Sequence, residues 1–298
     1  MVDFHATAHA ARLVGSLLAE GLTQVVVVDN SGEGMTRAGF TAAGVRLGDA
    51  VAIVEPSLNA GFGAGVNAGM EEVVADVVIV ANPDTVPETG AVARLLEALQ
   101  ADGALGIVGP ALLEADGSLH QSARKFPTIG ASSLQAFAGL LAPQGRLARR
   151  YRARNWESSS GQYVDWVSGA FFAVRREAFE SIGGFDPAYF MYVEEVDLCW
   201  RLSRAGWRAG YVPLARVTHL GGASARAHPY RMLVSRHRSL WLFARRSTDG
   251  MRRAALPVVA AGLAVRLLLA LSRELAGRLD APRGGGPGSE RDGAGRHG

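Results

Sequence analysis

The chain has 298 residues, 48% hydrophobic and 20% charged, which is typical of a folded globular protein and excludes a largely disordered one. Its formal net charge of +3 comes from arginine, because Lys125 is the only lysine; this mild excess suits phosphate-bearing ligands or an anionic membrane and does not indicate nucleic acid. A single cysteine, Cys199, excludes an intramolecular disulfide and a cysteine-based zinc site, and favours a reducing, cytoplasmic setting.

The first two thirds of the chain alternate short β-branched runs with helical patterns, which predicts an α/β fold with a mostly parallel sheet flanked by helices. We expect strands at residues 25–28, 51–54, 77–81 and 106–108, and helices at residues 8–20, 65–75 and 90–101. The first three strands each end in a polar loop. Because ligands lie outside the carboxyl ends of strands in open α/β sheets, these loops are the expected place of a site.

The pattern changes after residue 112. We expect a hairpin turn at 116–118, an arginine-rich and weakly structured stretch at 124–162, a strand at 164–174, and helices at 176–182 and 194–205. No internal repeat or linker separates these segments, so residues 1–250 are predicted to form a single domain.

The end of the chain combines apolar and basic residues. Residues 254–271 are almost wholly apolar, but Arg266 interrupts them, and a central arginine costs roughly 2.5 to 3.5 kcal/mol in a spanning helix. We therefore expect residues 251–275 to form a helix lying on a membrane surface, with a buried core helix or a true span as alternatives. Residues 281–298 lack apolar periodicity and are predicted to be a disordered tail.

Two aspartates directly follow apolar strands. Asp84 lies in Asn82-Pro83-Asp84 after VVIVA, where a carboxylate can bind a divalent cation that neutralises a diphosphate, although the tripeptide is also a good turn. Asp29 ends VVVV and could accept hydrogen bonds from a base or ribose, or cap the following turn.

The glycine-rich segment at residues 59–69 raises the alternative of a dinucleotide-dependent oxidoreductase, because it follows a strand and opens a helix. Its spacing, Gly63-x-Gly65-x-x-x-Gly69, departs from the dinucleotide fingerprint, and it follows the second expected strand instead of the first. The oxidoreductase reading is therefore the weaker one.

Three acids, Glu194, Glu195 and Asp197, gather behind an aromatic run at a helix start. Part of this pattern is explained by the helix dipole, but adjacent carboxylates can also supply a general base that deprotonates a hydroxyl. Asp197 and Arg201 are one turn apart and are expected to pair.

Basic residues follow the last expected strand. His219, just before two glycines, could be a ligand of a cation or phosphate or an ordinary surface or core residue. The basic cluster between residues 226 and 238 could bind an acidic acceptor or form a solvated face.

Taken in order, five segments of the chain resemble family 2 glycosyltransferases with the GT-A fold, especially the bacterial branch of rhamnosyltransferases that act on polyprenyl-diphosphate acceptors. These segments are VVVVDNSG, NAGFGAGVNAG, NPDT, the run from VDWVSG to DLCWR, and HLGGAS, and they span residues 25–224.

The resemblance assigns roles to individual residues. Asp84 and His219 would hold a divalent metal, Mn²⁺ or Mg²⁺, and Glu195 would be the catalytic base, with Glu194 as the alternative. Donor contacts would come from Asp29, Asn59, Gly63, Asn82, Trp166, Ser168 and Gly169. Of these, Asp29 would contact the nucleobase side of the donor, and Trp166, Ser168 and Gly169 would line the cleft.

The implied activity is inverting, metal-dependent transfer of a hexose onto a polyprenyl-diphosphate-linked saccharide, in cell-wall or surface polysaccharide synthesis. The expected donor is dTDP-L-rhamnose, and the expected location is peripheral, at the cytoplasmic face of the plasma membrane. A catalytically silent, membrane-associated nucleotide-sugar binder is the other alternative.

Two features depart from the family pattern. Glu195 stands where the family most often has an aspartate. Residues 1–4 are short for a first strand, because strands of such sheets usually run about 5 to 6 residues, and we therefore expect the natural protein to begin upstream of Met1.

Overall fold

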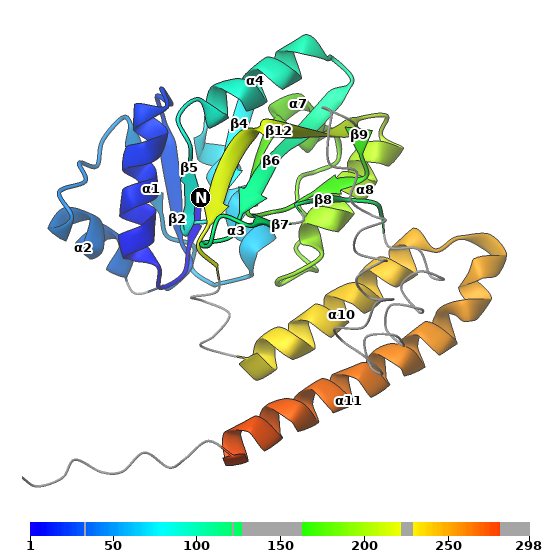
Figure 1. Cartoon of the computed structure of the whole chain (residues 1–298). Coiled ribbons are helices and arrows are strands. Elements are labelled where there is room, and N and C mark those ends of the chain that lie inside the picture. The colour runs from blue at the N-terminus through cyan, green and yellow to red at the C-terminus, as the bar shows by residue number, and fades with distance from the viewer. Residues whose placement is uncertain (33, 121, 127–162, 222–228, 281–298) are drawn as a thin grey trace, which may run out of the picture.

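The computed structural model describes residues 1–32, 34–120, 122–126, 163–221 and 229–280. It has an α/β body from which two long helices extend (Figure 1). Most of the predicted arginine-rich stretch and the whole predicted tail at 281–298 lie outside the described residues.

The first sheet is parallel throughout, in the order β1-β2-β3. Its strands are β1 (Val2–Asp3), β2 (Val25–Asp29) and β3 (Val51–Val54), and its helices are α1 (Thr7–Ala19), α2 (Met35–Ala42) and α3 (Phe62–Glu72). The β-branched run of β2 is buried at every position, as expected for a strand covered on both faces. Helix α3 begins three residues earlier than the glycine pattern predicted.

Strand β1 is short but paired. The Met1 ammonium donates to the carbonyl oxygen of Val26 at 2.7 Å, and the amide of Asn30 donates to the Asp3 carbonyl at 2.8 Å. The expectation that residues precede Met1 stays a prediction.

The second sheet is mixed, with the path β4-β11-β6-β12-β5. Its path strands are β4 (Val77–Ala81), β5 (Thr85–Pro87), β6 (Leu105–Leu113), β11 (Phe171–Arg175) and β12 (Arg208–His219). Only β6 and β12 run parallel along this path, so the mostly parallel arrangement that the sequence predicted holds for the first sheet and only part of the second.

The predicted strand at 164–174 is wrong as one element, because the chain changes partners within it. It divides into β9 (Tyr163–Val164), which pairs with β12, β10 (Trp166–Val167), which pairs with β8 (Ala123–Arg124), and β11. The hairpin turn predicted at 116–118 is confirmed, since β7 (Leu119–His120) folds back on β6.

Both faces of the second sheet are buried. Phe171 and Phe172 point to opposite faces and are fully buried, one in the cluster beneath α1 and α4 (Ala91–Ala101), the other in the cluster with α3 and α8 (Glu194–Arg204). The short helix α7 (Arg176–Ser181) ends before Gly183 and Gly184, as the sequence predicted.

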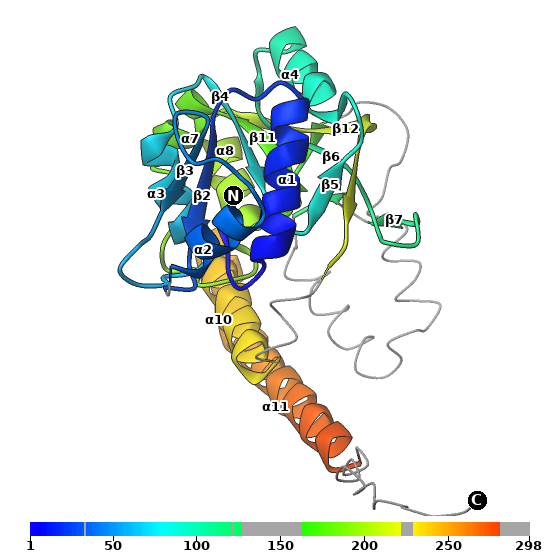
Figure 2. The same ribbon diagram turned by 90° about the vertical axis from the view of Figure 1, so that its left-hand side faces the viewer.

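The chain ends in a helical hairpin of α10 (Pro229–Ser247), the 3₁₀ turn η1 (Gly250–Ala255) and α11 (Leu256–Asp280). Figures 1 and 2 both show α10 and α11 side by side, extending away from the body. The sequence analysis did not predict α10, which is rich in arginine. The segment Gly250–Leu275, with mean hydropathy 2.2, is long and apolar enough to cross a membrane, and none of its apolar window is buried by the part of the chain that the structure describes.

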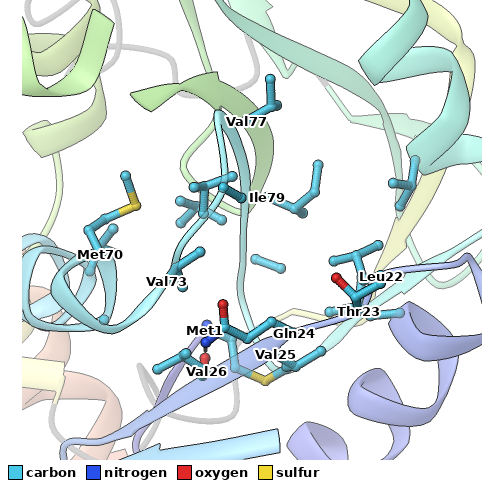
Figure 3. A pocket seen from close by; sticks show the side chains of 18 of the residues that line it. Met1, Leu22, Thr23, Gln24, Val25, Val26, Met70, Val73, Val77 and Ile79 are labelled. Atoms are coloured by element: carbon cyan, nitrogen blue, oxygen red, sulfur yellow. Dashed lines mark hydrogen bonds between the residues drawn. The ribbon is translucent and has the colours of Figure 1, made fainter. Parts of the chain in front are cut away.

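An apolar cavity of about 220 Å³ lies between the two sheets (Figure 3). Met1 and Val26 line it on one side, and Met70, Val73 and Ile79 line it on the other. Because Glu20 is the only acidic or basic side chain in its lining, this cavity offers little polar chemistry, and it lies apart from the loops described next.

Candidate active site

The antiparallel pairing of β5 with β12 brings two predicted metal ligands together. His219 lies opposite Thr85, and the amide of Leu220 donates to the Asp84 carbonyl oxygen at 2.9 Å. As a result, His219 Nε2 lies 3.3 Å from Asp84 Oδ1. The turn that carries Asp84 is held by Asn82, whose carbonyl accepts a hydrogen bond from the Thr85 hydroxyl at 2.7 Å.

The environment of Asp84 favours its anionic form. Burial alone would raise the pKa of this carboxyl, but the hydrogen bond and charge of His219, together with the charge of His9, lower the pKa below its usual value. His9 belongs to α1, which packs against β5. The sequence analysis missed His9 because an isolated histidine in a helix carries no signal of its own.

This pair fits a divalent cation as part of a ligand set. One carboxylate oxygen and one imidazole nitrogen are suitable donors, but no group of three or more such side chains gathers within the described ranges. Magnesium-type cations are commonly held by one or two protein ligands together with substrate phosphates. The residues therefore fit a metal that a diphosphate completes.

A strained turn precedes the predicted catalytic acids. Tyr192 and Val193 have φ angles of 68° and 70°, in the left-handed region that non-glycine residues seldom adopt, and Val193 is the N-cap of α8. The hydroxyls of Ser235 and Ser239 on α10 hold the preceding Met191 carbonyl at 3.2 and 3.0 Å. Helix α10 thus supports the backbone that presents these acids.

The two adjacent glutamates differ in access to solvent. Glu194 is 6% exposed, and its Oε2 has no hydrogen-bond partner in the part of the chain that the structure describes. Burial, and then the neighbouring Glu195 charge, raise the pKa of Glu194 well above its usual value. Glu195 is partly exposed; burial raises its pKa too, while backbone hydrogen bonding and the charges of Arg124 and Arg236 oppose that rise.

Gly169 lies directly against Glu195. A Cβ on this glycine would be 3.4 Å from the Glu195 Cβ, which is van der Waals contact. Its neighbour Ser168 is fixed by an amide hydrogen bond of 2.7 Å to the Ser122 carbonyl, and Trp166 in β10 donates from Nε1 to the Lys125 carbonyl at 3.1 Å. Since β10 packs against α8, these three predicted residues gather beside Glu195.

One hydrogen bond joins the Glu195 side of the site to the Asp84 side. The amide of Asn82 donates to the Ala170 carbonyl at 2.7 Å, which ties the turn before Asp84 to the turn that follows Gly169. The structure therefore brings the predicted base and the predicted metal ligands to the end of the second sheet where β4 and β12 terminate.

Asp29 caps its own loop, which is one of the two readings that its sequence position allowed. Its carboxylate is buried and accepts from the amide of Ser31 at 2.9 Å and from that of Thr36 at 3.2 Å. Asp3, which the sequence analysis missed, lies opposite it and accepts from the hydroxyls of Thr36 and Thr7, each at 2.9 Å. Contact between Asp29 and a nucleobase stays a prediction.

The glycine-rich segment packs a helix closely against strands. A Cβ on Gly63 would lie 2.9 Å from the Phe185 Cβ, and one on Gly65 or Gly69 would lie 3.0 Å from valine methyl groups of β1 or β2. Asn59 Oδ1 accepts from the Gly61 amide at 3.0 Å. These contacts explain the glycines by packing, and the donor contacts predicted for Asn59 and Gly63 stay predictions.

The buried carboxylate of Asp197 connects α8 with α10. It accepts from Arg201 Nε at 2.7 Å, as predicted, and also from Tyr189 at 3.2 Å and Arg246 at 2.8 Å. Arg246 also pairs with Asp186. The sequence analysis missed Arg246 because its partners lie far away in the sequence.

We expect Asp197→Ala to lower the free energy of unfolding by about 3 kcal/mol or more, because it leaves two arginines without their buried partner. Chemical denaturation measures this loss. Glu55→Gln, which breaks the exposed 3.4 Å pair with Arg37, is the matched control and is expected to cost less than about 1 kcal/mol. Equal losses for the two variants would contradict the structural role of Asp197.

Fold and site together define a glycosyltransferase. The family model "Glycosyltransferase like family 2" matches residues 2–246, and the chain belongs to this family. The chain is 34% identical over 252 residues to N-acetylglucosaminyl-diphospho-decaprenol L-rhamnosyltransferase of Mycobacterium tuberculosis, a match that covers 81% of this chain and 80% of that one. It is 38% identical over 103 residues to rhamnosyltransferase WbbL of Escherichia coli, covering 34% of this chain and 36% of the relative.

A solved structure agrees on the fold. The mannosyltransferase PcManGT of Pyrobaculum calidifontis, in complex with GDP-Man and Mn²⁺, superposes with a TM-score of 0.55 at 17% identity, covering 94% of this chain and 79% of that chain. The predicted GT-A fold is confirmed, and the oxidoreductase alternative is replaced by membership of the glycosyltransferase family.

Proposed function

We propose that this glycosyltransferase moves a hexose from a nucleotide-sugar donor, with inversion, onto a polyprenyl-diphosphate-linked saccharide. The observation that carries the proposal is the Asp84–His219 pair, joined through the Asn82–Ala170 hydrogen bond to the turn beside Glu195. A cation site for a diphosphate and a carboxylate base therefore share one end of the sheet, as an in-line displacement requires.

Glu195 suits the role of base better than Glu194. A base must reach the proton that it removes, and Glu195 is partly exposed whereas Glu194 is 6% exposed. The raised pKa of Glu195 also makes its carboxylate a stronger base for the acceptor hydroxyl. Because the hydroxyl attacks the sugar directly, a single base is sufficient and the configuration at the anomeric carbon inverts.

Asp84 and His219 would hold Mn²⁺ or Mg²⁺ together with the donor diphosphate. Such a cation supplies charge neutralisation to the departing nucleoside diphosphate. Support comes from the anionic state of Asp84 and from the Mn²⁺ present in the complex of PcManGT.

The donor and acceptor are proposed from the printed activity of the mycobacterial relative, an L-rhamnosyltransferase whose acceptor is N-acetylglucosaminyl-diphospho-decaprenol. We propose dTDP-L-rhamnose as donor and a similar lipid-linked sugar as acceptor. Because the acceptor is a lipid, we place the enzyme peripherally at the cytoplasmic face of the plasma membrane, with α11 on its surface.

A transfer assay tests this function. The full chain is incubated with a panel of dTDP-, UDP- and GDP-sugars, Mn²⁺ and a short polyprenyl-diphosphate N-acetylglucosamine, and the product is identified by mass and anomeric configuration. Transfer of rhamnose with inversion is the expected result. Donor binding without transfer to any acceptor would favour the silent-binder alternative, and retention of configuration would remove Glu195 as the direct base.

Removing residues 253–298 is expected to lower binding to anionic vesicles while leaving the body folded. Helix α11 exposes the apolar side chains of Val258, Val265 and Leu268, which can contact a membrane. Apart from its contacts with η1, it packs mainly on α10, and α10 stays attached to the body through Arg246. Vesicle co-sedimentation measures the effect, with removal of residues 281–298 alone as the control. Equal sedimentation of both truncated forms would place the membrane contact elsewhere.

A further inference from the structure

Arg266 is the charged residue in the middle of the apolar helix α11, and its surroundings are unusual. It is partly buried, on a helix that packs against α10. Burial lowers the pKa of its guanidinium, and the nearby charge of Arg236 on α10 lowers it further. Because Arg236 lies eleven residues before the end of α10 and Arg266 lies ten residues after the start of α11, the hairpin places an exposed and a partly buried arginine at a similar level of two packed helices.

Arg236 extends this positive region toward the catalytic acids. Its neighbour Ser235 bonds the Met191 carbonyl, so Arg236 lies where α10 meets the turn before Glu194. Its charge lowers the pKa of both Tyr192 and Glu195 against the effect of burial. Arg236 is thus close to the base as well as to Arg266.

His237, which follows Arg236 on α10, is a third basic group. His237 is 6% exposed, its Nδ1 lies 2.8 Å from the Leu233 carbonyl, and its Nε2 has no hydrogen-bond partner in the described ranges. Burial lowers the pKa of His237, and the charges of Arg266 and Arg236 lower it further. His237 therefore adds a buried nitrogen with no partner in the described ranges to the level of the hairpin that carries the two arginines.

None of these groups has a carboxylate partner among the described residues, whereas other arginines of the protein do. Arg246 pairs with Asp186 and Asp197, and Arg201 pairs with Asp197. Two adjacent guanidinium groups repel each other unless an anion lies between them. A diphosphate suits them because arginine binds phosphate oxygens through two parallel hydrogen bonds.

We propose that Arg236 and Arg266, with His237 behind them, bind the diphosphate of the lipid-linked acceptor. The site rests on the proposed function for the identity of its ligand. Helix α11 exposes apolar residues, which would contact the lipid chain, and α10 holds the turn before Glu195, which would receive the proton of the sugar hydroxyl. The hairpin then holds the acceptor by its diphosphate while its sugar reaches the base.

The direct test is binding of farnesyl diphosphate to the full chain in detergent, compared with binding of farnesol. The parent is expected to bind the diphosphate more tightly than the alcohol. Arg266→Gln is expected to weaken diphosphate binding by about ten-fold or more, the scale of a charge-assisted hydrogen bond, and to leave farnesol binding unchanged. Arg273→Gln, an exposed arginine on the same helix, is the matched control and is expected to bind like the parent.

Kinetics distinguish the diphosphate of the lipid acceptor from the diphosphate of the nucleotide-sugar donor. For Arg266→Gln the KM for the lipid-diphosphate acceptor should rise, while the KM for the nucleotide-sugar and the rate with a neutral alkyl glycoside acceptor should not change. A raised donor KM would instead assign these arginines to the donor, and equal losses with both acceptors would indicate damage to Glu195.

The outcomes also distinguish this site from the proposed function. Unchanged farnesyl diphosphate binding in both Arg266→Gln and the double variant with Arg236→Gln would overturn the site, even if the parent transfers sugar. Arginine-dependent binding by a parent that transfers no sugar would support the site and overturn the proposed function.

Discussion

Replacing Glu195 with glutamine is expected to lower turnover by at least about 100-fold, the usual size of a general-base contribution. Glutamine keeps the shape of the side chain beside Gly169 but cannot accept the hydroxyl proton. Donor affinity should not change, because the donor diphosphate is assigned to the Asp84 side of the site. Steady-state rates and donor titration of the same protein sample measure both quantities.

Glu194→Gln is the matched control for this variant. Burial raises the pKa of its carboxyl, which favours the protonated form that glutamine resembles. We expect a loss of less than about ten-fold. If Glu194→Gln is the more damaging change, the two roles must be exchanged.

The pH dependence of the parent follows from the same pKa. A general base acts only when deprotonated, so kcat/KM should be high above the pKa of Glu195 and fall as the pH drops through it. Because burial raises this pKa, the fall is expected at a higher pH than for an ordinary glutamate. In Glu195→Gln, kcat/KM should not fall at low pH in this way. If the same fall persists in the variant, the titrating group is not Glu195.

Replacing Asp84 with alanine is expected to abolish metal-dependent nucleotide binding. The change removes the carboxylate whose anionic state His219 and His9 maintain, and leaves one protein ligand of the pair. Calorimetric titration of dTDP with and without Mn²⁺ measures the effect. The parent should bind more tightly with the metal, whereas the variant should bind equally weakly under both conditions.

Asp49→Ala is the control for Asp84→Ala, because it removes an exposed carboxylate from a loop outside the site. It should keep the full effect of Mn²⁺ on dTDP binding. A variant at Asp84 that binds nucleotide and metal as tightly as the parent would show that the metal assignment is wrong.

The order of strands and loops was readable from the sequence because it depends on local chemistry. Runs of valine and isoleucine between glycines and polar residues predicted β2, β3 and β4 almost to the residue. Asp29 and Asp84 do follow these strands, but the structure assigns the strands to two different sheets. The order of the quoted motifs indicated the family, which the family match confirms.

Tertiary structure alone decided which of these residues act together. The sequence could not show that β5 pairs with β12 and so sets Asp84 beside His219, because register depends on contacts between distant segments. It could not separate Glu194 from Glu195, since adjacent residues of a helix differ in burial only once the helix has packed.

Helix α10 shows the same limit most clearly. It is attached to the body by packing of the buried Phe243 with Tyr189 and Val196, and by polar contacts between distant segments, in which Arg246 reaches the buried Asp197 and two serines hold the Met191 carbonyl. Such contacts have no periodic signature, because a salt bridge or a hydrogen bond needs only one residue on each side. The support by α10 of the turn before Glu194 is therefore a property of the folded chain, while the candidate residues Asp84, Glu195 and His219 were already visible in the sequence.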